Sequence, residues 1–321
     1  MSLDSIYKNS KFKNIYIFIA FGITGFLFSF YLFPYYIGGD QIAYRNFYGN
    51  ILDIGDLEST FGFYKDTVGA IEPGFFVFTY LLATFFEKDL IYSVINGLFM
   101  GLSVYYFKRL GASLLVILLL ILNFYFIVLF FSTERLKLAF LLFEFAFIFK
   151  SWFRYVLLIT SILFHLQMLI PLMVYLIWLY CGNEKHSKPI FIILIITSIL
   201  FVCYSPVSSF LLNYVQAKRE FYLDAGWGGF YDLIKPVILL SIAIFFSDEK
   251  KRFFYASLPV LIAAFLVGSG RVTIFAYALM LITSLRVRNG LNLPVVASGI
   301  YFAITGIIFT LDFMENGYSG N

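Results

Sequence analysis

The stretch FSTERLKLA, residues 131–139, decides the fold, because it places three charged side chains inside an apolar run that extends from Ser113 to Phe149. Each ionisable group at membrane depth costs about 2.5–3.5 kcal/mol on insertion scales, and such groups survive mainly where they face a protein interior or a wet cavity. Glu134, Arg135 and Lys137 therefore predict a buried polar site within a bundle of membrane helices.

The composition supports a membrane protein from end to end. Of the 321 residues, 61% are hydrophobic and only 13% are charged, whereas a soluble domain carries about 25% charged residues. Apolar runs long enough to cross the roughly 30 Å hydrocarbon layer recur along the chain. The net charge of +4 comes from Lys/Arg clusters between these runs, as expected of membrane-facing loops, and gives no reason to expect a nucleic-acid partner.

Metal and cofactor signals are lacking in the sequence. Cys181 and Cys203 are the only cysteines and fall near opposite ends of one expected helix, so neither a disulfide framework nor a thiolate site follows. The only histidines, His165 and His186, are expected on opposite sides of the membrane. With no P-loop, dinucleotide fingerprint or nucleophile elbow in the sequence, we expect neither a metal nor a cofactor.

The N-terminal part predicts an anchor followed by an outer loop. The run from Ile15 to Ile37 is too long for a signal-peptide core and is interpreted as a retained span, with the preceding lysines on the cytoplasmic side. Residues 38–72 carry six carboxylates against two basic residues and are expected to form a loop on the outer side.

Two segments leave the topology open. Pro73–Phe86 is short for a span, and Tyr155–Tyr180 is either one long helix or a tight pair that turns near His165. A re-entrant Pro73–Phe86 and a turn at His165 would place most of the basic clusters on the cytoplasmic side, in agreement with the positive-inside rule. Span length alone favours the simpler alternative, two spans over 73–107 and one over 155–180, but we adopt the first.

The whole chain, 1–321, is then one all-α membrane domain with about 11 transmembrane helices and one re-entrant segment. The remaining spans are expected at about 189–204, 231–247, 253–268, 271–285 and 293–311, with a second outer loop over 205–230. In this orientation the chemically interesting side chains all fall at the outer ends of their elements: Asp40, Glu72, Arg135, His165, Arg219 and Arg271.

Arg135 is the leading candidate for a ligand-binding cation. On a helix that starts near Thr133, Glu134 and Lys137 are neighbours and can pair, whereas Arg135 points about 100° away from Glu134. Arg135 then needs a phosphate or an acid from another element, and a guanidinium grips phosphate oxygens bidentately. The alternative is an arginine that extends to lipid headgroups.

Two further arginines are candidates for binding an anion. Arg271 begins a helix after Gly268-Ser269-Gly270, where close backbone approach and the helix N-terminus both favour an anion. A headgroup anchor explains it equally well. Arg219 lies next to Glu220, and a surface ion pair is the simpler explanation there.

Two acids and a histidine are candidates for proton transfer. Asp40 follows Gly38-Gly39 after the first span, and Glu72 precedes Pro73, so that both stand at the membrane ends of one loop. A carboxylate in a partly dehydrated cavity can act as a general base, although each acid alone is equally well a loop carboxylate or a helix cap. His165 lies in an apolar stretch, where it is either a structural residue or a neutral donor or base.

Five aromatic residues of the expected outer segments can stack on sugar rings: Tyr44, Tyr48, Tyr64, Tyr222 and Trp227. The aromatic belts at membrane interfaces use the same residue types and are the alternative explanation.

These residues, taken in order, resemble the EpsG/Wzy-type family of bacterial polysaccharide polymerases. The matching pieces run from residue 39 to 277: Gly39-Asp40 with Tyr44, Glu72-Pro73-Gly74-Phe75, Ser132-x-x-Arg135-x-x-x-Ala139, Phe164-His165 before a Leu/Pro-rich run, and Arg271 followed by a tyrosine. One departure is Leu166-Gln167-Met168, where the family usually has a small residue soon after the histidine.

The resemblance implies a GT-C-like glycosyltransferase in the bacterial inner membrane, with its active site facing the periplasm. It would join undecaprenyl-diphosphate-linked repeat units of an O-antigen (lipopolysaccharide), capsule or exopolysaccharide. Arg135, Arg271, Arg219 and Tyr44 would bind the diphosphate and glycan, and Asp40, Glu72 or His165 would serve as the base. The expected partners are polyprenyl-diphosphate-linked glycans and membrane lipid, and whether a chain-length regulator protein also binds is left open. A flippase or transporter, a membrane acyltransferase and a ligase of the same pathway are the alternative functions.

Overall fold

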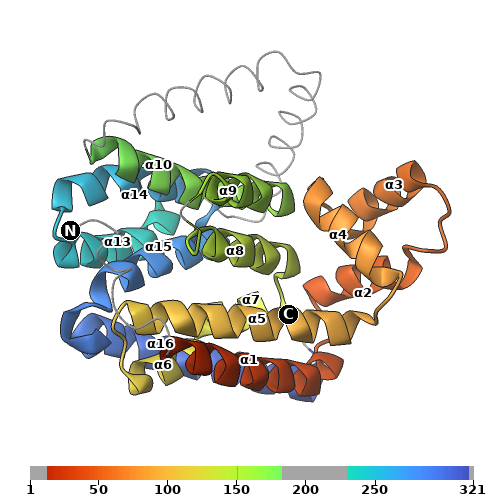
Figure 1. Ribbon diagram of the computed structural model, residues 1–321, viewed down its shortest axis with the longest axis horizontal. Helices are drawn as coiled ribbons and strands as arrows, with labels where there is room; N and C mark the ends of the chain where they lie inside the picture. The colour runs from red at the N-terminus through yellow and green to blue at the C-terminus, as the bar shows by residue number, and fades with distance from the viewer. Residues whose placement is uncertain (1–12, 150, 183–229, 318–321) are drawn as a thin grey trace, which may run out of the picture. The chain divides into compact units, whose positions relative to one another are not determined.

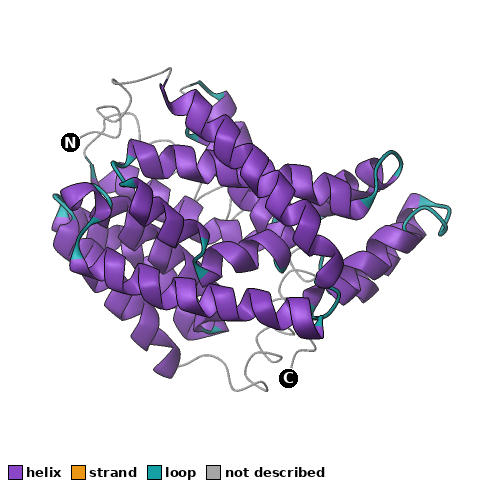
Figure 2. Ribbon diagram, turned by 90° about the horizontal axis from the view of Figure 1, so that it is seen from below, coloured by secondary structure: helices purple, strands orange, loops and turns teal. Residues whose placement is uncertain are grey.

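The computed structural model describes residues 13–149, 151–182 and 230–317. All regular secondary structure in these ranges is helical, and Figure 2 shows helices joined by loops with no strand among the described residues. The predicted all-α fold is confirmed for this part of the chain. The expected span over 189–204, and nearly all of the expected outer loop over 205–230, with Arg219, Tyr222 and Trp227, lie outside the described residues.

The chain divides into two compact units, one formed by the chain up to Met168 with Arg288 onward, the other by Leu169–Val287. The first unit contains α1 (Lys13–Leu32), η2 (Phe33–Tyr35), α2 (Asp40–Asn50), α3 (Leu57–Val68), α4 (Pro73–Ala83), α5 (Lys88–Arg109), α6 (Leu114–Ile121), α7 (Phe124–Phe131), α8 (Glu134–Ala146), α9 (Phe153–Phe164), η3 (Leu166–Met168) and α16 (Leu293–Asn316). The second contains α10 (Leu169–Cys181), η4 (Tyr231–Leu233), α13 (Ile234–Phe246), α14 (Lys250–Val267) and α15 (Ser269–Ser284). The short turn η5 (Val287–Gly290) connects the second unit back to the first. The expectation of a single membrane domain stays a prediction.

Several helices fit a membrane protein by length and composition. Among the described residues, Ile15–Tyr35, Lys88–Arg109 and Val287–Asn316 are long and apolar enough to cross a membrane. The pair α6 and α7, bent by 52° at its break, adds a fourth if it forms one span. Shorter apolar helices include α4, α9 and α15. The expected count of about 11 crossings and the GT-C architecture stay predictions.

α1 has an exposed apolar face of the kind that fits a lipid environment. One of its faces carries Ile19, Ile23 and Leu27 at helical spacing, with exposed fractions of 48%, 56% and 58%. Soluble proteins rarely expose contiguous apolar faces of this kind. The opposite face of α1 packs on α5, which runs beside it in Figure 1.

Glycines permit the close approach of α1 and α5. A Cβ added at Gly97 would lie 2.7 Å from the carbonyl oxygen of Gly22, and one added at Gly101 would lie 2.7 Å from that of Phe18. Small residues of this kind are typical of packed membrane helices, because they let the two backbones meet.

The segment over 38–72, expected as an outer loop between spans, is largely helical, and its place on the outer side stays a prediction. It contains α2 and α3; Asp56 caps α3 by accepting a hydrogen bond from the Ser59 amide, and Gly69 ends α3 in a left-handed conformation. Together with α4, these helices gather beyond one end of α5 (Figure 1, orange). Its six carboxylates indicated a segment outside the membrane, and the structure adds that its aromatic side chains pack the helices together.

Two features of the helices help to decide between the alternative topologies. α9 ends at Phe164, and His165 takes an extended conformation before a new helical segment, so residues 155–180 are not one continuous helix. α4 has 11 residues and spans only about 16 Å, about half the hydrocarbon layer. Both observations agree with the topology that we adopted, although its membrane orientation stays a prediction.

We predict that Gly97→Ala destabilises the protein by about 1–3 kcal/mol, because the new methyl group overpacks the α1–α5 contact. The measurement is the thermal unfolding temperature of the purified protein in detergent. Gly62→Ala is the matched control: nothing lies within 4 Å of its added Cβ, and an alanine inside α3 stabilises by about 0.5–1 kcal/mol. An unchanged unfolding temperature for Gly97→Ala would contradict the packing described here.

Candidate functional site

The centre of the candidate site is an ion pair between Arg135 and Glu72. Nη1 of Arg135 lies 2.7 Å from Oε2 of Glu72, and the two side chains are 10% and 3% exposed. Arg135 lies in the first turn of α8, and Glu72 directly precedes α4. Of the partners expected for Arg135, the structure provides an acid from another element, and the buried side chain does not extend to headgroups.

Two further predicted residues complete what we call the Arg135 cluster: Tyr44, Glu72, Arg135 and His165. Nε of Arg135 donates a hydrogen bond of 3.2 Å to the hydroxyl of Tyr44 on α2. Nδ1 of His165 lies 3.5 Å from Oε1 of Glu72, the carboxylate oxygen that does not face Arg135. The cluster thus joins residues that are up to 121 positions apart in the sequence, all within the first unit.

Local sequence explains how Glu72 reaches His165. Pro73 occupies the first turn of α4, where its fixed φ favours the helix and its missing N–H costs nothing. Gly74 follows, and a Cβ added there would lie 2.9 Å from the backbone carbonyl of Leu163. The start of α4 can therefore contact the end of α9 directly, and α9 terminates at the extended residue His165.

His165 has two contacts at the same ring nitrogen. Besides lying near Glu72, Nδ1 accepts a 3.4 Å hydrogen bond from the backbone N–H of Gln167. A bond to Glu72 requires the proton on Nδ1, whereas acceptance from Gln167 requires it on Nε2. Nδ1 of His165 thus faces both a carboxylate and a backbone donor, and the two contacts favour different tautomers of the ring.

Tyr44 supplies a neutral hydroxyl beside Arg135. Burial raises the pKa of Tyr44, and the charges of Asp40 and Glu134 raise it further, while Arg135 acts in the opposite direction. The hydroxyl therefore stays protonated at neutral pH and can donate to a ligand oxygen while it accepts from Arg135. Asp40 is the half-buried first residue of α2, one helical turn before Tyr44.

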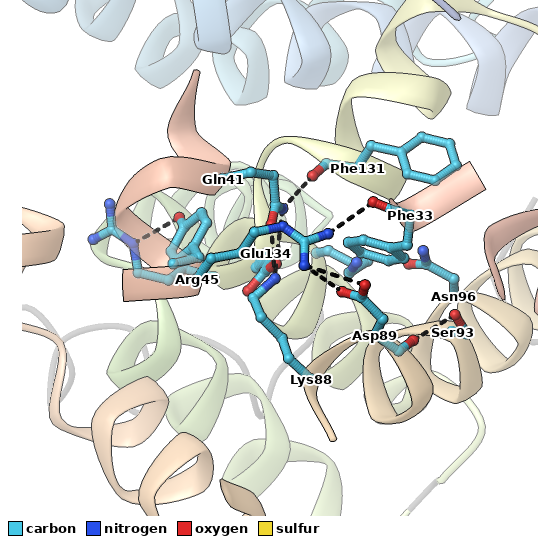
Figure 3. A network of polar contacts seen from close by, with 12 residues as sticks. Phe33, Gln41, Arg45, Lys88, Asp89, Ser93, Asn96, Phe131 and Glu134 are labelled. Carbon is cyan, nitrogen blue, oxygen red and sulfur yellow. Dashed lines mark hydrogen bonds and ion pairs between the residues drawn. The ribbon is translucent and has the colours of Figure 1, made fainter. Parts of the chain in front are cut away.

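A second buried network lies next to the Arg135 cluster, and Figure 3 shows its side chains pointing toward one another. Nζ of Lys88, at the start of α5, lies 2.5 Å from Oε1 of Glu134 and 2.6 Å from Oε1 of Gln41. The amide nitrogen of Gln41 donates to the same Glu134 oxygen at 2.8 Å and to the carbonyl of Phe131 at 2.6 Å. We call Gln41, Lys88 and Glu134 the Lys88 network.

The expected pairing of Glu134 with Lys137 is not formed. Glu134 bonds to Lys88 and Gln41 instead, and Nζ of Lys137 donates to the carbonyl of Phe130 at 2.8 Å. Lys137 is fully buried, with its ammonium group 5.7 Å from the ring centre of Phe33 and 5.3 Å from that of Tyr92. Two aromatic rings and a backbone carbonyl therefore surround the ammonium group of Lys137, in place of the carboxylate of Glu134 that the sequence suggested.

The Lys88 network fixes how α2 lies against α8. Gln41 and Tyr44 are three residues apart and share a face of α2, while Glu134 and Arg135 are adjacent at the start of α8. Gln41 binds Glu134 and Tyr44 binds Arg135, so one helix-to-helix register makes both contacts. Arg45 adds a link from α2 to α5 through Asp89, at 3.0 Å.

The sequence did not single out Gln41 or Lys88. Lys88 stands between Glu87 and Asp89, in a hydrophilic triplet typical of a loop between spans. Its burial at the start of α5 follows only from the way α2 and α8 cover it.

Arg271 belongs to the second unit, in the first turn of α15 after the positive-φ residue Gly268. The nearby hydroxyl of Ser269 donates to the carboxylate of Asp232. The expected convergence of Arg271 with Arg135 stays a prediction. Arg219 lies outside the described residues.

The described residues contain no group of three or more His, Cys, Asp or Glu side chains that could hold a metal ion. In the comparisons with known proteins, no family model, curated protein or solved structure matched this chain. The site is therefore interpreted from its own geometry.

We predict that Gly74→Ala separates α4 from α9 and exposes His165, because its methyl group would overlap the Leu163 carbonyl. Overpacking of this kind costs about 1–3 kcal/mol. Modification of His165 by diethyl pyrocarbonate, followed by mass spectrometry, measures the exposure. Gly49→Ala, with nothing within 4 Å of the added Cβ, is the control and should leave His165 protected. Equal protection in both variants would contradict the contact.

We also predict that Lys88→Met lowers the free energy of unfolding by about 3–5 kcal/mol, because it leaves Glu134 charged, buried and without a cation. The double variant Lys88→Met/Glu134→Gln should recover part of the loss, since a neutral amide needs no cation. Lys251→Met, at an exposed position on α14, is the control and should change stability by less than about 0.5 kcal/mol. A Lys88→Met protein as stable as the parent would argue against the network.

Proposed function

We propose that the protein is a membrane glycosyltransferase that polymerises undecaprenyl-diphosphate-linked oligosaccharide repeat units at the outer face of the bacterial inner membrane. The observation that carries the proposal is the Arg135 cluster. A guanidinium buried among apolar helices is held by a carboxylate and a tyrosine hydroxyl, a histidine lies beside that carboxylate, and each of these groups would have a role in glycosyl transfer.

In the proposed reaction, a hydroxyl of the acceptor sugar attacks the anomeric carbon of the donor glycan. The bond from that carbon to the diphosphate oxygen breaks, and undecaprenyl diphosphate leaves with the bonding electrons. The hydroxyl proton passes to a base. No redox partner is needed, because the electron pair that leaves with the diphosphate is balanced by the new glycosidic bond.

Arg135 would bind the diphosphate and stabilise the negative charge that grows on it as the bond breaks. Fixed donors in a dry site act strongly, and removal of one such donor typically costs about 10²–10³-fold in rate. Arg271 is proposed as a second cation at the same group. Tyr44 would hold Arg135 and offer its hydroxyl to the substrate.

The proton would pass to Glu72, with Asp40 as the alternative base and His165 as a third candidate. Glu72 is supported by its place between Arg135 and His165, with one carboxylate oxygen facing each of them. A diphosphate that binds Arg135 would compete with Glu72 for the guanidinium and would free a carboxylate oxygen for the acceptor hydroxyl, with His165 still beside it.

One observation favours a second function, transport of the same lipid-linked sugars. The bent pair α6–α7 is a broken helix, and transporters build their substrate sites from discontinuous helices. Such helices usually occur in corresponding positions of repeated halves, and the sequence shows no clear repeat. A flippase is therefore the second candidate, ahead of an acyltransferase or a ligase.

We predict that Arg135→Lys and Arg271→Lys each abolish long glycan chains while the protein is still made and inserted, because lysine keeps the charge but cannot bind bidentately. Glycan ladders on gels, with immunoblots of the membrane fraction, provide the measurement. Arg109→Lys at the distant end of α5 is the control and should keep normal ladders.

A deletion strain separates the candidate functions. Loss of a polymerase leaves a single repeat unit on the final acceptor, loss of a flippase leaves almost none, and loss of an acyltransferase preserves chain length. Normal ladders from both arginine variants would refute the assigned site.

A further inference from the structure

Glu144 on α8 is an acid that takes part in neither the Arg135 cluster nor the Lys88 network. It lies nine positions after Arg135, which is about 14 Å along the helix. The three residues on each side of it are apolar: Leu141, Leu142 and Phe143 before it, and Phe145, Ala146 and Phe147 after it. A carboxylate without a cation is costly in such surroundings, so the presence of this acid needs an explanation.

The carboxyl group of Glu144 faces Ser103 on α5. Oγ of Ser103 lies 3.1 Å from Oε1 and 3.4 Å from Oε2 of Glu144, and the serine is 3% exposed. One turn further along α5, the hydroxyl of Tyr106 donates a 2.8 Å hydrogen bond to the backbone carbonyl of Glu144. Two side chains on one face of α5 thus hold Glu144 in place, all within the first unit.

No ion pair joins Glu144 to a base in the part of the chain that the structure describes. The elements that pack on α8 are α5, α7, α9 and η3. η3 carries no titratable side chain and α7 carries only Tyr125. The titratable residues of α9 and of the last two turns of α5 are Arg154, Tyr155, Tyr105, Tyr106, Lys108 and Arg109.

The bases of this group bond to oxygen atoms other than those of Glu144. The bonds join Lys108 to the carbonyl of Ala112, Arg109 to the hydroxyl of Tyr105, and Arg154 to the carbonyl of Phe149. The charged residues of α8 itself, Glu134, Arg135 and Lys137, lie at its other end. The Ser103 hydroxyl is therefore the polar side chain that the structure places against the Glu144 carboxyl.

The two distances to Ser103 indicate which form of the carboxyl is present. A serine hydroxyl has one proton to donate, whereas its oxygen can also accept a hydrogen bond. A neutral carboxyl fits both distances, because its carbonyl oxygen accepts from Ser103 while its own O–H donates back to Oγ. An ionised carboxylate would leave its second oxygen beside Oγ with no proton between them.

We propose that Glu144 and Ser103 form a proton-binding site between α5 and α8, in which Glu144 is a neutral carboxylic acid at neutral pH. Such an acid reacts with an apolar carbodiimide. The acid O–H adds across one C=N bond of the reagent: the oxygen bonds to the carbon, the proton moves to the nitrogen, and no group leaves. The inference does not depend on the proposed function, because Glu144 takes no part in the proposed glycosyl transfer.

The first test treats the purified full-length protein in nanodiscs with N,N′-dicyclohexylcarbodiimide and measures the adducts by peptide mass spectrometry. Glu58, exposed in the first turn of α3, is the matched control. An ordinary glutamate with a pKa of about 4.3 is protonated to only about 0.2% at pH 7, so Glu144 should be labelled about 100-fold more than Glu58. Its labelling should fall at higher pH, since ionisation removes the reactive O–H. Equal labelling of the two residues would overturn the inference.

Infrared spectroscopy provides a second test that does not depend on access of the reagent. Glu144→Gln keeps the shape of the side chain and its hydrogen bond to Ser103, so the variant should unfold at the parent's temperature. At neutral pH the change should remove a protonated-carboxyl band that shifts in heavy water. Loss of a carboxylate band instead would contradict the neutral acid.

The role of Ser103 is tested in the same spectra. Ser103→Ala should move the acid band to higher frequency, because the carbonyl oxygen loses its hydrogen bond. Ser93→Ala is the control: Ser93 is also buried on α5, but its hydroxyl donates to the backbone carbonyl of Asp89, so the band should stay in place. An unshifted band in Ser103→Ala would overturn the pairing of Ser103 with Glu144.

Discussion

The Arg135–Glu72 ion pair is the constraint on which the arrangement of the first unit depends. Among apolar helices a lone guanidinium or carboxylate is costly, so each must find its partner wherever the chain brings it. Here the partner comes from a different element: α8 provides the cation, and the residue before α4 provides the acid. The pair therefore ties the helices of residues 40–83 to the start of α8.

The polar groups near the start of α8 form two clusters with different tasks. The Lys88 network is closed, because each of its charged groups has a partner within 2.8 Å, and it sets the register of α2 on α8. The Arg135 cluster instead joins three further elements to α8, because Arg135 bonds to Tyr44 on α2 and to Glu72 before α4, and Glu72 lies beside His165 after α9.

Residues whose chemistry conflicts with their surroundings could be singled out from the sequence. Arg135, Glu72, Tyr44 and His165 were all predicted, and they meet in space, because a charge in an apolar run or a carboxylate before Pro-Gly is visible as an exception. The prediction from the sequence was wrong where the outcome depended on a third element: Glu134 was expected to pair with Lys137 at helical spacing, yet Lys88 and Gln41 reach it first. Helical neighbours gain only about 0.2–0.5 kcal/mol from pairing, which a buried contact with another helix easily exceeds. Tyr64 was considered as a ring for sugar stacking, but its side chain is completely buried against Phe47, Phe75 and Phe76, so the ring offers no free face.

The sequence by itself determined that the chain is helical and apolar enough for a membrane, where the helix with Arg135 begins, and that its charged residues require a protein interior. Those properties follow from composition, local propensity and the cost of burying charge, which are local quantities. Only the tertiary structure decided which acid neutralises Arg135, that residues 40–68 form helices packed on aromatic side chains, and that Lys88 lies buried between α2 and α8. Partner choice depends on distances between elements far apart in the chain, and a linear pattern carries no information about those distances.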